Sequence, residues 1–141
     1  MKILIAADGS SYTKRMLAYL AAHDEWLGNA VHNFTVLTVS PPVPPRAAAV
    51  LDKDLLKNYY VEENERVFKP IRTFLKKQGI QAEYVAKVGH AADTIAKMAD
   101  TGDFDLLMMG SHGHSTLSSL VMGSVTTKVL AHCKVPVLLV R

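Results

Sequence analysis

Residues 104–124 read FDLLMMGSHGHSTLSSLVMGS, and this stretch is the most informative part of the sequence about the fold. It begins with a short, largely apolar run (104–110), which is typical of a strand buried on both faces of a parallel sheet. Glycines follow at Gly110, Gly113 and Gly123. Because glycine destabilises regular elements, a cluster of it marks backbone that bends or closely approaches another group. The stretch therefore predicts a buried strand followed by a turn built for close contact.

Outward from this stretch, apolar periodicity predicts strands and helices that alternate along the whole chain. The expected strands are residues 2–7, 33–40, 81–88, 104–110 and 135–140, and the expected helices are residues 11–29, 47–78, 90–102 and 123–133. Such alternation predicts one α/β domain over residues 1–141, with a doubly wound, mostly parallel five-stranded sheet and helices on both faces.

Local signals set the expected ends of these elements. Ser10 or Ser11 is the expected N-cap of the first helix, and Gly28 is expected near its end. The proline-rich residues 41–46 are expected to form a surface loop. Pro70 should kink or interrupt the long second helix, because proline removes one helical hydrogen bond and clashes with the preceding turn.

Composition limits the classes of function. The 141 residues carry a net charge of +3, with 49% hydrophobic and 21% charged residues. The basic residues are scattered and not interleaved with aromatic ones, which argues against a nucleic-acid partner but favours a small anionic ligand. No apolar run approaches the length of a membrane span or signal peptide, and Cys133 is the only cysteine. We therefore expect a cytoplasmic protein without a disulfide, in which Cys133 is either packed and inert or activated by Lys134.

Two polar turns are expected to line one crevice. In doubly wound sheets, ligands bind beyond the carboxyl ends of the strands, where the winding direction reverses. Asp8 begins the polar turn after the first strand, and residues 110–113 form the turn after the fourth strand. Asp8 is expected to accept a hydrogen bond from a ribose hydroxyl, to hold a phosphate-bound Mg²⁺, or only to cap the first helix.

The third part of the expected crevice is a helix N-terminus. Gly123 and Ser124 begin the helix that follows the glycine turn, and the first N–H groups of a helix are unpaired and favour an anion. The hydroxyls of Ser124, Thr126 and Thr127 add donors in the first turn. These parts suit a di- or triphosphate. The alternative is that the glycines only end a strand and begin a helix.

The spacing excludes two common phosphate-binding motifs. It matches neither G-x-x-x-x-G-K-[ST] nor the dinucleotide-binding G-x-G-x-x-G. No lysine lies between Gly110 and Gly123. Without a cation over the terminal phosphates, rapid phosphoryl transfer is poorly supported.

The glycine spacing resembles a known family pattern. Gly110, Gly113, Gly123 and Ser124 match G-2x-G-9x-G-[S/T], which resembles the signature of the nucleotide-binding branch of the universal stress protein family. The opening KILIAADGSSYTKRML and the closing GSVTTKVLAHCKVPVLLV are also similar to that family's first strand and helix and its last helix and strand. The resemblance covers essentially the whole chain.

This resemblance implies a sheet of strand order 3-2-1-4-5, a bound ATP-type nucleotide (ATP, ADP or AMP) with Mg²⁺ held through its phosphates, and a homodimer formed through the last strand, Val135–Val140. It places Asp8 at the nucleotide and the main chain of Val39 at the adenine. The predicted nucleotide-binding residues are Ala7, Asp8, Val39, Met109, Gly110, His112, Gly113, Gly123, Ser124, Val125 and Thr126.

The loop also departs from the family pattern. His112 and His114 stand where relatives often have arginine, and residues 116–122 lack the basic residues that some members have there. We therefore expect lower phosphate affinity, or pH-dependent affinity if a histidine must be protonated. A metal site formed by His112, His114 and His90 is an alternative that would need three convergent ligands.

The sequence favours a regulatory switch or sensor that binds nucleotide and hydrolyses it slowly at most. One alternative is a weak ATPase or phosphotransferase whose missing cation comes from a partner. Another is a dimeric interaction module with an empty cleft. A third is a different adenine ligand, AMP or cyclic AMP, which the glycine pattern does not distinguish from ATP.

Overall fold

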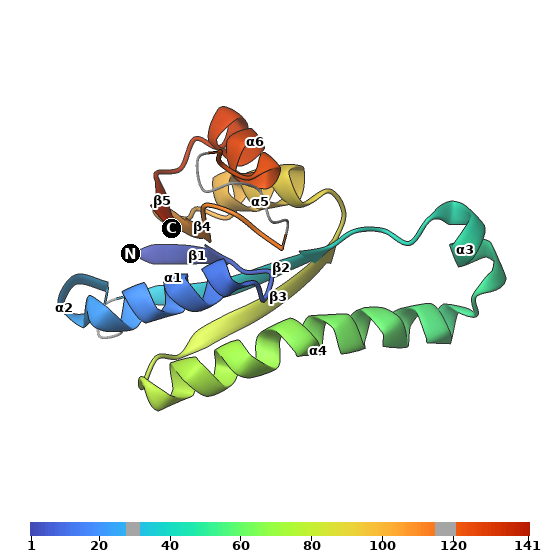
Figure 1. The fold of residues 1–141 in the computed structure, drawn as a ribbon, viewed down its shortest axis with the longest axis horizontal. Helices are drawn as coiled ribbons and strands as arrows, with labels where there is room; N and C mark the ends of the chain where they lie inside the picture. Colours follow the sequence, from blue (N-terminus) through green and yellow to red (C-terminus); the bar gives the residue numbers. More distant parts are fainter. Residues whose placement is uncertain (28–31, 115–120) are drawn as a thin grey trace.

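The computed structural model describes residues 1–27, 32–114 and 121–141, and its centre is a five-stranded sheet (Figure 1). The strand order is β3-β2-β1-β4-β5 and every neighbouring pair is parallel, which confirms the predicted order. The strands are β1 (Lys2–Ala6), β2 (Asn33–Ser40), β3 (Ala82–Val88), β4 (Leu106–Gly110) and β5 (Val137–Val140).

Helices cover both faces of this sheet, so the predicted doubly wound α/β architecture is confirmed. The helices are α1 (Ser11–Ala22), α2 (Asp24–Leu27), α3 (Pro45–Val50), α4 (Lys53–Lys77), α5 (Ala91–Thr101) and α6 (Ser124–His132). Figure 1 shows α1 and α4 on one face and α5 and α6 on the other.

Alternate residues of β1 divide the core into two apolar clusters. Ile3 and Ile5 pack with residues of α1 and α4, whereas Leu4 packs with residues of α5 and α6. All three side chains have 0% exposure. A strand buried on both faces must be apolar at every position, which explains why β1 and β4 are continuously hydrophobic in the sequence.

The prediction of a single helix over residues 47–78 is wrong, because the structure has two helices there, α3 and α4. Leu51 and Asp52 are extended, with ψ angles of 137° and 144°. The Asp52 carboxylate accepts a hydrogen bond from the N–H of Asp54 at 3.4 Å and caps α4. Capping competes with helix continuation at aspartate, so α4 begins anew after Asp52. The loop expected over 41–46 is also too long, since Pro45 already begins α3.

Two other expected helix ends differ from the structure. Helix α4 continues through Pro70, so the expected interruption is wrong. Arg66, whose carbonyl loses its partner at Pro70, is exposed, and water can satisfy that carbonyl. The first helix ends at Ala22, and the short α2 follows. The stop expected at Gly28 lies outside the described residues.

Helix α4 packs on the sheet only along its second half. Its buried side chains are Phe68, Ile71 and Leu75, and α3 has no buried residue. In Figure 1, α3 and the start of α4 extend beyond the sheet. The part of the molecule that positions a site is therefore the sheet with α1, α5, α6 and the second half of α4.

Replacing Ile5 with alanine tests the central position of β1. We expect Ile5→Ala to lower the free energy of unfolding by about 3 kcal/mol, because it leaves a cavity between α1 and the sheet. Leu55→Ala is the control, since Leu55 is 59% exposed and its change should stay within about 0.5 kcal/mol. Urea unfolding followed by circular dichroism measures both. Equal losses in the two variants would contradict this account of the core.

Candidate functional site

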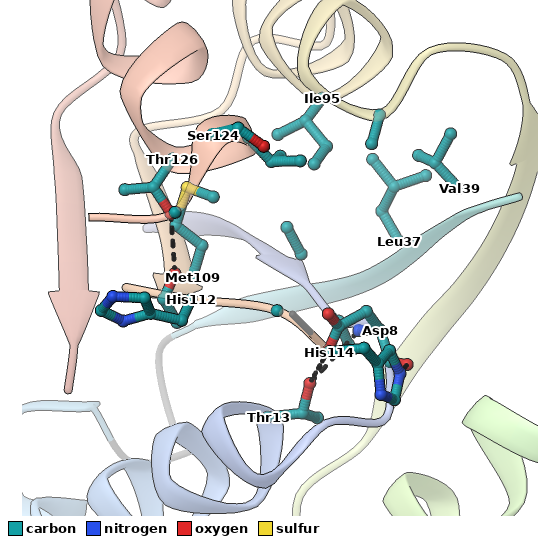
Figure 2. A pocket seen from close by; sticks show the side chains of 17 residues that line it. Asp8, Thr13, Leu37, Val39, Ile95, Met109, His112, His114, Ser124 and Thr126 are labelled. Carbon is teal, nitrogen blue, oxygen red and sulfur yellow. Dashed lines mark hydrogen bonds between the residues drawn. The ribbon is translucent and has the colours of Figure 1, made fainter. Parts of the chain in front are cut away.

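A cavity of about 200 Å³ lies at the carboxyl ends of the strands (Figure 2). Its walls come from β1, β2, β4, the start of α5 and the start of α6. The lining includes all the predicted residues, namely Ala7, Asp8, Val39, Met109, Gly110, His112, Gly113, Gly123, Ser124, Val125 and Thr126. The structure therefore brings these residues together around one space.

The topology of the sheet creates this cavity. The central strand β1 pairs with β2 on one side and with β4 on the other. The chain leaves β1 through α1 on one face, whereas it leaves β4 toward α6 on the opposite face. The two connections diverge, and the space between them at the carboxyl ends remains open.

Asp8 organises the turn that follows β1. Its Oδ1 accepts hydrogen bonds from the N–H of Ser10 at 2.9 Å and from the hydroxyl of Thr13 at 3.0 Å, and the N–H of Asp8 donates to Thr13 Oγ1. Ser10 is the N-cap residue of α1, but its buried hydroxyl has no hydrogen-bond partner among the described residues. Asp8 thus fixes the turn before α1, and Ser10 occupies the expected N-cap position without a capping bond from its side chain.

The second carboxylate oxygen of Asp8 faces the glycine loop. A Cβ atom on Gly113 would lie only 2.7 Å from Asp8 Oδ2. A Cβ on Gly123 would lie 3.3 Å from both His112 Cα and Ser111 O. Glycine at these two positions therefore lets the loop approach Asp8 and the start of α6 closely.

The start of α6 is held against the end of β4 by Thr126. This side chain is 2% exposed, and its hydroxyl donates to the carbonyl of Gly110 at 3.2 Å (Figure 2) and to that of Ser111 at 3.1 Å. The hydroxyl of Thr127 donates to the carbonyl of Gly123 at 3.0 Å. The expectation that these two hydroxyls point to a ligand is therefore wrong, because both are used within the protein. The hydroxyl of Ser124 remains at the exposed cavity edge.

The two loop histidines bind main-chain carbonyls. Nε2 of His114 lies 2.6 Å from the carbonyl oxygen of Asp8, and Nε2 of His112 contacts the carbonyl of Val121. Nδ1 of His112 is 2.9 Å from Ser111 Oγ. A ring nitrogen that faces a carbonyl must donate, so neutral imidazoles with a hydrogen on Nε2 satisfy these contacts. The two histidines therefore position the loop through contacts with main-chain carbonyls.

The charge of the cavity comes from one carboxylate. Among the described residues no lysine or arginine lines it, and Asp8 is its only acidic residue. The part of the chain that the structure describes also contains no group of three potential metal ligands, so His90 does not join the loop histidines. The prediction about residues 116–122 falls mostly outside the described residues.

Sequence reasoning missed several residues that line the cavity. They are Ala6, Thr13, Leu37, Ala91 and Ile95. His114, which was expected only as a departure from the family pattern and as an alternative metal ligand, also lines the cavity. Leu37 could have been found, because it lies two residues before Val39 and so faces the same side of β2. Ala91 and Ile95 are four residues apart on α5, but the sequence carries no signal that this face reaches the cavity.

Cys133 is not activated by its lysine neighbour. Burial raises the pKa of its thiol above the usual value, and the nearby Asp100 carboxylate, 3.7 Å from Sγ, contributes in the same direction. The backbone of Lys134, not its ammonium group, binds the same carboxylate. The described residues thus support the packed, inert form of Cys133.

The fold and this cavity define a doubly wound α/β protein with an open site at its strand carboxyl ends, and comparison with known proteins gives the family. The profile of the universal stress protein family matches residues 1–141. The chain therefore belongs to the universal stress protein family. This finding confirms the resemblance that the glycine spacing indicated.

Individual relatives agree with this assignment. The chain is 34% identical over 140 residues to universal stress protein Slr1230 of Synechocystis sp.. The aligned region covers 99% of this chain but 42% of that protein. It is 34% identical over 86 residues to universal stress protein MJ0577 of Methanocaldococcus jannaschii, covering 61% of this chain and 53% of that protein. The chain thus spans about half the length, or less, of these two relatives.

Solved structures share the fold. The structure of MJ0577 superposes with a TM-score of 0.78 at 28% identity, covering 99% of this chain and 94% of that one. An Arabidopsis thaliana family member with AMP bound has a TM-score of 0.70 at 14% identity, covering 99% and 90% of the two chains. A universal stress protein in complex with cAMP has a TM-score of 0.60 at 23% identity, covering 100% and 96%.

Removing the Thr126 hydroxyl tests whether it holds α6 against the glycine loop. We expect Thr126→Val to lower the free energy of unfolding by about 1–2 kcal/mol, because two carbonyls lose their donor in a buried place. Thr127→Val is the matched control on the same helix, and its exposed position should limit the change to about 0.5 kcal/mol. Urea unfolding measures both, and an equal or larger loss in Thr127→Val would refute the assignment.

Proposed function

We propose that this protein binds an adenine nucleotide in the cavity at the carboxyl ends of β1 and β4. It would act as a regulatory switch or sensor in a stress response. The observation that carries the proposal is the close approach of Gly113 to Asp8 beside the start of α6. Three separate segments of the chain meet there without large side chains between them.

The cavity has a suitable apolar end for a base. Leu37, Val39 and Ile95 lie together on one side of the space in Figure 2, away from His112 and Thr126. An adenine ring would pack against these side chains and form hydrogen bonds with the main chain near Val39. Asp8 Oδ2 would then accept a hydrogen bond from a ribose hydroxyl.

The opposite end suits phosphates. The first N–H groups of α6, those of Ser124, Val125 and Thr126, have no partner within the helix, and the helix dipole favours an anion there. Gly123 caps the helix without a side chain, so no hydroxyl or carboxylate occupies these donors. A phosphate at this point would be bound mainly by backbone N–H groups and the Ser124 hydroxyl.

The residues fit a Mg²⁺ ion that is held chiefly by phosphates. Asp8 Oδ2 is a hard oxygen ligand, and it is the carboxylate oxygen in the cavity that the turn does not use. Such an ion would neutralise phosphate charge, and Asp8 Oδ2 would hold it as the alternative to its contact with a ribose hydroxyl. Because neither lysine nor arginine lines the described cavity, we expect hydrolysis to be slow.

Two neighbours in structure support the choice of an adenine nucleotide. They contain AMP and cAMP, each in a fold that this chain shares. Their ligands differ in phosphate arrangement, so the nucleoside is the better supported part of the proposal. ATP as the native ligand rests on the sequence resemblance.

We also propose a homodimer that forms through β5 and the residues before it, Val135–Val140. Strand β5 pairs with β4 along one edge, and it ends the sheet on the other. An apolar edge strand is a pairing surface unless it is covered.

The structure contains no helix in its described residues that is long and apolar enough to cross a membrane. The cytoplasmic location remains a prediction of the sequence.

Analysis of the purified protein identifies the ligand directly. Protein freshly purified from cells, denatured and separated by anion exchange with mass detection, should release a roughly stoichiometric adenine nucleotide. Protein that releases none and also fails to bind added AMP, ADP or ATP would refute the proposed function.

Substitution of the glycines tests the location of the site. We expect Gly113→Val and Gly123→Val to weaken nucleotide binding at least about tenfold, equivalent to roughly 1.4 kcal/mol, because their side chains enter the space between the loop, Asp8 and α6. Ala86→Val, at an exposed position of β3, adds bulk away from the cavity and should bind normally. Isothermal titration calorimetry measures the affinities, and circular dichroism checks the fold. Unchanged affinity in the folded glycine variants would place the ligand elsewhere.

A further inference from the structure

A second depression, which we call the side groove, adjoins the candidate cavity. It has a volume of about 380 Å³ and is lined by His90, Ala91, Ala92, Asp93, Ser124, Val125 and Lys128. Ala91, Ser124 and Val125 line both spaces. The cavity itself, at about 200 Å³, is smaller than the roughly 300–1,000 Å³ of typical ligand sites. A bound nucleotide would therefore extend beyond the cavity, and the side groove is the depression that adjoins it at these three residues.

The side groove contains the cation that the cavity lacks. Lys128 is exposed on α6, and within residues 1–27, 32–114 and 121–141 its ammonium group takes part in no ion pair or hydrogen bond. His90, just before α5, faces the same groove from the other side. His90 precedes α5 and Lys128 lies in the middle of α6, so the two side chains come from different elements and do not form a stripe on one helix.

The position of Lys128 lets it reach the edge of the cavity. Ser124 and Lys128 are four residues apart on α6 and therefore lie on the same face. Helical side chains lean toward the N-terminus of their helix, which favours an approach of the ammonium group to Ser124, and both residues line the side groove. A phosphate chain that leaves the start of α6 next to Ser124 would meet it.

We propose that the side groove is the binding site for the terminal phosphates of a nucleoside di- or triphosphate, with Lys128 as the residue that selects for phosphate number. This inference rests on the proposed function, because it assumes that the nucleoside lies in the candidate cavity. His90 is the second donor to the same phosphates. The cation thus comes from the body of α6 and not from the glycine loop, where the sequence has none.

Asp93 provides a second test, because its negative charge should oppose the phosphate binding that Lys128 favours. Its carboxylate lies in the first turn of α5 and lines the same groove. It also lines a separate groove with Lys97, one turn further along α5. A terminal phosphate in the side groove would be repelled by Asp93 and attracted by Lys128. Removing the charge of Lys128 should therefore lower the affinity for triphosphates, and removing the charge of Asp93 should raise it.

The test measures affinities for adenosine, AMP, ADP and ATP by isothermal titration calorimetry, with and without Mg²⁺. We expect the wild-type affinity to rise from AMP to ATP. Lys128→Met should weaken ATP binding about three- to tenfold, as for a charge-assisted contact that is partly screened by solvent, and should leave adenosine and AMP unchanged. Lys128→Arg should retain the preference for ATP. Asp93→Asn should strengthen ATP binding about two- to fivefold.

Lys97→Met is the matched control. Lys97 is an exposed lysine close to Asp93 that does not line the side groove, so its loss should leave the ATP-to-AMP ratio unchanged. An unchanged ratio in Lys128→Met, or an equal change in Lys97→Met, would overturn the side groove while leaving nucleotide binding intact. A wild-type protein that binds none of the four compounds would overturn the proposed function together with this inference.

Discussion

The pairing of β1 with both β2 and β4 is the constraint on which the rest of the structure depends. All three strands are parallel, so each connection must cross over one face of the sheet before the next strand begins. The chain leaves β1 toward α1 and leaves β4 toward α6, on opposite faces. The carboxyl ends of these neighbouring strands are therefore left with a gap that no connection fills. The same pairing requires Ile3, Leu4 and Ile5 to be apolar, since both faces of β1 are covered.

The glycine loop and the start of α6 border this gap mainly with backbone. Gly113 and Gly123 keep the loop close to Asp8 and to the start of α6, and the hydroxyl of Thr126 holds the two segments together. Asp8 divides its carboxylate between the turn, through Oδ1, and the cavity, through Oδ2. The positive charge beside this site is on Lys128, which lines the side groove and not the cavity.

Much of this could be predicted from the sequence, because the deciding signals are local. Continuous apolar runs located β1 and β4, and the spacing of Gly110, Gly113 and Gly123 located the candidate site. The remainder depended on contacts between distant segments. The sequence pattern of the long helix ran through residues 51 and 52, whereas the capping bond from Asp54 to Asp52 divides it. The hydroxyl of Thr126 looked like a ligand donor until its two carbonyl partners were known. Ile95 reaches the cavity only because α5 crosses the sheet beside α6, which no local pattern encodes.

The central claim is that the β1 turn, the glycine loop and the start of α6 bind one ligand together. Amide chemical shifts of ¹⁵N-labelled protein during a titration with Mg²⁺–ATP test it most directly. The account predicts that the largest shifts occur together at Asp8, Gly113, Ser124 and Val125, with one common dissociation constant, while amides at the opposite ends of the strands, such as Asn33 and Ala82, stay unchanged. Saturable shifts confined to another surface, or shifts in the glycine loop without any at α6, would contradict it.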